Sequence, residues 1–169
     1  MTVRIRAGEL ADVPLIAELI RGLARYEKLE DEVTMTEEKL TDALFGERRY
    51  AETLIAEDDG APVGFALFFH NFSTFLAQPG IYLEDLFVLP EHRGRGIGKT
   101  LLADLARIAV DRGCGRLEWA VLDWNRDAIG FYERLGAKPN SEWTVYRLTG
   151  ESLRSLAQPG ARRAQFKRE

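Results

Sequence analysis

A run of three alternating glycines near the middle of the chain has the character of a phosphate-binding turn. Gly94, Gly96 and Gly98 lie between a predicted strand and a stretch in which apolar residues recur at helical spacing. Such a turn at a helix N-terminus leaves backbone N–H groups unpaired, and the helix dipole adds positive charge there. The turn is therefore predicted to bind phosphate, although a lone glycine triplet can also serve only as a tight corner.

Spacing excludes the two common nucleotide motifs at this turn. A Walker A loop needs a glycine five residues before Gly98, and that position is Arg93. A dinucleotide fingerprint that begins at Gly94 or Gly96 needs a glycine at Lys99 or Leu101. The phosphorylated ligand is thus predicted to be of another class.

Two groups of acidic residues lie at positions where they could bind a cationic substrate. Glu84 and Asp85 are neighbours in the predicted strand 81–89, so alternation is expected to direct them to opposite faces, and only one can face a reaction. Between residues 27 and 38 a second group of acids has Lys28 as its only basic neighbour. Such a group is usually a solvated face, but it can also attract and align a polycation. Its members are Glu27, Glu30, Asp31, Glu32, Glu37 and Glu38.

The elements that must position these residues follow an α/β pattern. Strands are predicted at 3–6, 53–57, 62–69, 81–89, 116–122 and 143–148, and helices at 13–24, after Thr34, at 98–112 and at 126–135. The turn at residues 58–60 joins two of the strands as a hairpin, and an acid three residues after Thr34 offers a helix cap. Helices that separate strands imply crossovers and a mixed, mostly covered sheet.

Composition favours one cytoplasmic domain. The 169 residues are 46% hydrophobic with a formal net charge of −4, so we expect a single domain at 1–157 with a basic tail at 158–169, and no nucleic-acid partner. A lone cysteine, Cys114, and the lack of a leader after Met1 fit a reducing cytosol. Apolar runs are too short to span a membrane. His70 and His92 are isolated, so no metal site is expected.

The spacing of Arg93, Gly96 and Gly98 resembles the pyrophosphate loop of the GNAT superfamily of N-acetyltransferases, and Asn125 and Tyr132 follow in that family's order. The resemblance implies a mixed, mostly antiparallel sheet with helices on both faces, and acetyl-coenzyme A as the co-substrate. In that family a bulge in the strand opens a slot for the pantetheine arm. The residues implied to contact the co-substrate are Leu86, Phe87, Val88, Arg93, Gly94, Arg95, Gly96, Ile97, Gly98, Lys99, Asn125 and Tyr132.

The same resemblance assigns roles in catalysis. Attack by an amine requires loss of a proton, because alkylamines have pKa values near 10. Glu84 is the implied proton acceptor, and Tyr132 the implied acid for the departing thiolate. Alternatively, Tyr132 and Phe131 only pack a helix against the sheet, and Asn125 only serves as the N-cap of that helix.

Within the superfamily the chain resembles the diamine acetyltransferases of the spermidine/spermine type, in segments 24–27, 45–47, 63–66, 82–88 and 142–143. This implies direct acetyl transfer to a small diamine or polyamine, in a homodimer whose interface includes the last predicted strand. Alternatives are an acceptor such as thialysine or a protein amine, or a sensor that only binds acetyl-coenzyme A. The implied substrate contacts are Tyr26, Glu27, Glu84, Glu118, Trp119 and Glu142.

Overall fold

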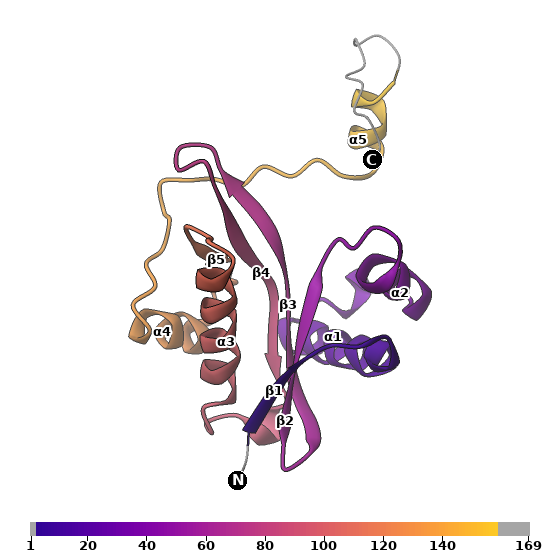
Figure 1. Ribbon diagram of the computed structural model, residues 1–169. Coiled ribbons are helices and arrows are strands. Elements are labelled where there is room, and N and C mark those ends of the chain that lie inside the picture. The colour runs from indigo at the N-terminus through magenta and orange to yellow at the C-terminus, as the bar shows by residue number, and fades with distance from the viewer. Residues whose placement is uncertain (1–2, 159–169) are drawn as a thin grey trace. The chain divides into compact units, whose positions relative to one another are not determined.

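The computed structural model describes residues 3–158 of the chain, shown in Figure 1. It divides into two compact units, residues 1–122 and 123–169, and each is described separately. The predicted basic tail lies outside the described residues except for Gln158. The single domain expected at 1–157 stays a prediction.

The first unit is a five-stranded sheet in the order β1-β2-β3-β4-β5. Neighbouring strands from β1 to β4 pair antiparallel, and β4 pairs parallel with β5, so the sheet is mixed and mostly antiparallel as expected. Helices α1 and α2 lie on one face and α3 on the other (Figure 1). The strands are β1 (Val3–Ala7), β2 (Glu52–Asp58), β3 (Ala61–Ser73), β4 (Gln78–Val88) and β5 (Leu117–Trp119); the helices are α1 (Val13–Glu27), α2 (Glu37–Phe45) and α3 (Ile97–Asp111).

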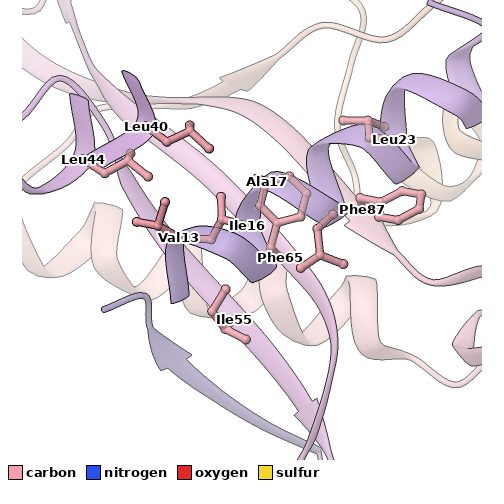
Figure 2. Packing of buried hydrophobic residues seen from close by; sticks show 10 residues of the cluster. Val13, Ile16, Ala17, Leu23, Leu40, Leu44, Ile55, Phe65 and Phe87 are labelled. Atoms are coloured by element: carbon pink, nitrogen blue, oxygen red, sulfur yellow. The ribbon is translucent and has the colours of Figure 1, made fainter. Parts of the chain in front are cut away.

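A hydrophobic core joins α1 and α2 to the sheet (Figure 2). Ile16 and Ala17 of α1 are fully buried in a cluster that includes Phe65 of β3 and Phe87 of β4. At Gly22 a Cβ would lie 2.9 Å from the Phe87 ring, so only glycine lets α1 approach this closely. The packing holds the C-terminal end of α1, which carries Tyr26 and Glu27, against the α1 face of the sheet.

Two local predictions in the first unit have different outcomes. The hairpin between β2 and β3 is confirmed, because Asp59 and Gly60 both adopt left-handed backbone conformations, with φ of 49° and 84°. The cap of α2 is Thr36 and not Thr34. Its hydroxyl accepts a hydrogen bond from the backbone N–H of Lys39 at 3.2 Å, since Thr36 directly precedes the first helical residue.

The second unit contains α4 (Arg126–Arg134) and α5 (Gly150–Leu156). The Asn125 side chain accepts a hydrogen bond from the Ala128 N–H at 3.2 Å, which confirms it as the N-cap of α4. The strand expected at 143–148 is wrong. These residues belong to no strand, and Trp143 and Tyr146 are 72% and 92% exposed. A strand needs hydrogen-bonding partners, and the described residues of the second unit include no other strand.

Candidate active site

A bulge in β4 determines which side chains face α1. Leu67 of β3 pairs with Asp85 while the next residue, Phe68, pairs with Leu83, so Glu84 is left without a partner on β3. An extra residue of this kind is a β-bulge, a common device beside active sites. The slot-opening bulge that the family resemblance implies thus has a counterpart here at Glu84.

The bulge directs two acidic side chains to one face of the sheet. Asp85 pairs with Leu67, which packs against the α1 core. Tyr82 pairs with Phe69, two residues beyond Leu67, so Tyr82 shares that face, and so does Glu84 two residues after it. The expectation that Glu84 and Asp85 point to opposite faces is therefore wrong, because the extra residue cancels one step of alternation.

Glu27, Glu84 and Asp85 form a group that we call the carboxylate cluster. Burial, together with the negative charges of Glu84 and Glu27, raises the pKa of Asp85 to about 6. Burial also raises the pKa of Glu27 at the end of α1. Glu84 is exposed on the bulge. The cluster combines one solvated carboxylate with two that are partly withdrawn from water, and a cationic substrate would relieve their mutual repulsion.

The bulge also marks the point where β4 and β5 part. Their pairing ends at Leu83 and Trp119, so β5 is shorter than the predicted strand 116–122, because a bulge bends its strand away from the neighbour. The Leu89 N–H donates to the Val63 carbonyl on β3 at 2.9 Å. Backbone groups alternate in direction along a strand, so those of Leu86 and Val88 point toward the β5 side. No strand of the first unit's described residues pairs with them there.

The glycine loop before α3 is open above its backbone. Gly94 and Gly96 have φ values of 73° and 83°, and a Cβ built at either would have no atom within 4 Å. The first α3 hydrogen bond runs from the Thr100 N–H to the Gly96 carbonyl at 3.0 Å. The preceding N–H groups of α3, at Ile97, Gly98 and Lys99, have no intrahelical acceptor. Open space over unpaired donors fits a diphosphate.

Both arginines of the loop contact protein groups on its flanks. The Arg93 guanidinium lies over the Tyr26 ring, 4.3 Å from its centroid, and its Nε donates to the Val88 carbonyl at 2.9 Å. The Arg95 guanidinium lies 2.7 Å from the Asp58 carboxylate at the end of β2. These contacts leave the loop's backbone N–H groups as the donors for a phosphate ligand.

Other predicted site residues lie on several elements. On β5, Glu118 pairs with Arg116 at 2.9 Å and accepts a hydrogen bond from Asn71 at 2.8 Å, so its charge is already compensated. Trp119 pairs with Leu83. In the second unit, Tyr132 lies on α4 with its ring centroid 5.3 Å from that of Phe131, and Glu142 is exposed. These residues belong to the second unit, and their roles stay predictions.

Sequence reasoning missed Asp85 and Tyr82 as members of this face. The only sequence signal was the adjacency of Tyr82, Glu84 and Asp85 on one apolar strand. Among residues 3–158, no grouping of His, Cys, Asp or Glu can hold a metal ion, and no helix is both long and apolar enough to cross a bilayer.

The raised pKa of Asp85 predicts a pH-dependent stability. The folded-state pKa of Asp85, about 6, exceeds the ordinary value of 3.8. The free energy of unfolding therefore contains a favourable contribution from the protonated carboxyl that is complete below about pH 4 and is lost as the pH rises through 6. The loss amounts to about 3 kcal/mol at most. Asp85→Asn should therefore be more stable than the wild type in urea denaturation at about pH 8 and equal to it at about pH 4. The same change at exposed Asp31 should have no effect at either pH, and an unchanged midpoint for Asp85→Asn at pH 8 would contradict the assignment.

Comparisons with known proteins identify the family. The chain matches the Acetyltransferase (GNAT) family over residues 17–137. It is 42% identical to Thialysine N-epsilon-acetyltransferase of Bos taurus, over 92% of this chain and 97% of the relative. It is 33% identical to L-ornithine N5-acetyltransferase NATA1 of Arabidopsis thaliana, over 92% of this chain and 88% of the relative. An integron cassette protein from the mobile metagenome of V. cholerae has a TM-score of 0.78 and 31% identity, over 94% of this chain and 99% of that structure. The chain thus belongs to the GNAT family and is an acetyl-coenzyme A-dependent N-acetyltransferase.

Proposed function

We propose that the acetyl acceptor is a primary amine of a small aliphatic molecule that carries a second cationic group. The carboxylate cluster is the observation that supports this proposal, since a dication can neutralise two buried or half-buried acids at once. A diamino acid is the first candidate, because two relatives are named for thialysine and L-ornithine. The polyamine expected from the sequence is the second.

Acetyl-coenzyme A, when bound, supplies the acetyl group as a thioester. The backbone N–H groups from Gly94 to Lys99 would hold its pyrophosphate. The outward backbone groups of Leu86 and the N–H of Val88 would hold its pantetheine arm, since the Val88 carbonyl already accepts a hydrogen bond from Arg93. Phe87 would support this edge only from within the strand, because its side chain is buried in the α1 core and its backbone pairs with Phe65 of β3. Asn125 is proposed as a further contact to the arm.

Two proton movements accompany the transfer. Glu84, exposed on the bulge, takes a proton from the acceptor amine at a carboxylate oxygen as the C–N bond forms. The Tyr132 hydroxyl gives a proton to the sulfur as the C–S bond breaks. Asp85 and Glu27 hold the second ammonium group of the acceptor, with Tyr26 beside them.

Three further residues are proposed for the acceptor site, each supported by fewer observations than the carboxylate cluster. Glu142, which is exposed in the second unit, is proposed by family resemblance as a contact to a cationic acceptor. Glu118 and Trp119 lie on β5, where Glu118 already pairs with Arg116. Glu118 is therefore assigned to shaping the β5 side of the site. A cytoplasmic location, with no nucleic-acid or membrane partner, completes the proposal.

The acceptor proposal is tested by thiol release from acetyl-coenzyme A with a panel of amines at neutral pH. Thialysine and ornithine should give the highest kcat/KM, spermidine and putrescine lower values, and a basic peptide little release. Monoamines of matched length should be poorer than diamines by about tenfold, because they leave part of the carboxylate cluster unpaired. Equal rates for monoamines and diamines would exclude the second-cation requirement. Coenzyme binding without release to any amine would favour the sensor alternative.

Single variants are expected to distinguish the roles of the acidic and phenolic groups, because some should change kcat and others KM. Glu84→Gln and Tyr132→Phe should lower kcat by about 100-fold and leave coenzyme A affinity unchanged, because both act on protons in the transition state. Asp85→Asn should instead raise the KM for the diamine about tenfold and leave the KM for a monoamine unchanged. A kcat within twofold of wild type for Glu84→Gln or Tyr132→Phe would remove that residue from the proton transfers.

We further propose a homodimer, by family resemblance, with Trp143, Val145, Tyr146 and Leu148 in the interface. Their high exposure in the second unit supports this proposal. Light scattering on the full chain should give twice the mass of 19.1 kDa, and Tyr146→Asp should shift the mass toward a monomer. A monomeric wild type would overturn the interface, and Arg147→Asp, at the neighbouring position, serves as the control.

A further inference from the structure

A buried charge lies next to the glycine loop and takes no part in the chemistry proposed above. Asp58 is the last residue of β2, and its side chain is only 4% exposed. Its Oδ2 is 2.7 Å from Arg95 Nη2 and 3.4 Å from His92 Nδ1. The Arg95 Nη1 is 3.0 Å from the same His92 nitrogen. Three charged or polar side chains therefore meet beneath the loop.

The hydrogen-bonding capacity of Arg95 and His92 determines which of them forms the ion pair with Asp58. A guanidinium can only donate, so His92 Nδ1 accepts from Arg95 and the imidazole proton lies on Nε2. His92 Nδ1 then has no hydrogen to give to Asp58, and Arg95 alone neutralises that carboxylate. The second carboxylate oxygen, Oδ1, is buried and has no hydrogen-bond partner among the described residues.

A buried ion pair with one unsatisfied oxygen is a poor source of stability, because desolvation offsets most of its attraction. Its position suggests another use. Arg95 stands between Gly94 and Gly96, whose left-handed backbones have no side chain to hold them. On the other flank, Arg93 is tied to the Val88 carbonyl and stacked on Tyr26. The loop is thus held at two points, by alternate arginines that engage different strands.

We propose that Asp58 is a positioning residue: through Arg95 it holds the glycine loop in its diphosphate-binding shape before the ligand arrives. Glycines lose much conformational entropy when they are ordered, and an ion pair that orders them in the free protein spares the ligand that cost. The proposal rests on the pyrophosphate site assigned above and is independent of the acceptor amine.

The test compares Asp58→Asn/Arg95→Gln with wild type. The double variant replaces both charges by amides, so no lone charge is left buried, and thermal unfolding checks that it folds. Calorimetry with coenzyme A should show a dissociation constant raised about tenfold, which is the size expected for one lost charge-assisted contact. The KM for acetyl-coenzyme A should rise by the same factor. Hydrogen exchange of the amides from Gly94 to Gly98 should become faster.

A matched control lies one residue away on the same strand. Glu57 pairs with Arg6 at 2.6 Å on β1 and does not contact the loop. Glu57→Gln should leave the dissociation constant and the loop exchange unchanged. Arg95→Lys, which keeps the charge but loses the planar fork, should fall between wild type and the double variant.

Two outcomes would overturn the positioning role. One is an unchanged dissociation constant in the folded double variant; the other is an equal loss in Glu57→Gln, which would indicate a general effect on the fold. Failure of the wild type to bind coenzyme A would be a different result, because it would remove the pyrophosphate site itself.

Discussion

The site depends on one extra residue in β4. Glu84 has no partner on β3, and this single irregularity has three consequences. It brings Glu84 and Asp85 to the face that carries α1, it coincides with the end of β5 pairing at Leu83, and it leaves Leu86 and Val88 with outward backbone groups. An uninterrupted strand would have sent one acid to the α3 face. The same strand therefore carries carboxylates on its α1 face and, on its β5 side, a backbone edge beyond Leu83 that pairs with no strand among the first unit's described residues.

The electrostatics of this face are consistent with the cationic ligand proposed above. Bringing Asp85 close to Glu84 and Glu27 and withdrawing it from water raises its pKa to about 6, so the ionised cluster weakens the folded state near neutral pH. The core beneath it tolerates this because Phe65, Phe87 and α1 bury a large apolar area. Binding of a cationic ligand would reduce the repulsion among these carboxylates and so restore the free energy of unfolding that the cluster lowers.

Sequence patterns predicted the parts of this fold that local chemistry determines. The Asp59-Gly60 turn, the helix after the glycine loop and the Asn125 cap each depend on residues within a few positions of one another. The family resemblance implied a bulge in this strand, but the residues alone did not give its position at Glu84, because a one-residue shift in pairing depends on contacts between β3 and β4 and leaves no mark in composition. The strand expected at 143–148 failed for a related reason. Alternating apolar residues are compatible with a strand, but only a partner strand makes one.

In the glycine loop, the proposed phosphate site, flexible residues are held in order by neighbouring side chains. Glycine is favoured there because a residue with a side chain at position 94 or 96 would have to adopt a strained left-handed backbone conformation. The same glycines also make the loop flexible, and a ligand that must order the loop binds with lower affinity. The side chains of Arg93 and Arg95 hold the loop from its flanks, since Arg93 contacts Val88 of β4 and Tyr26, and Arg95 contacts Asp58. Positive side chains in a phosphate loop can therefore serve the phosphate indirectly, by fixing the backbone that binds it.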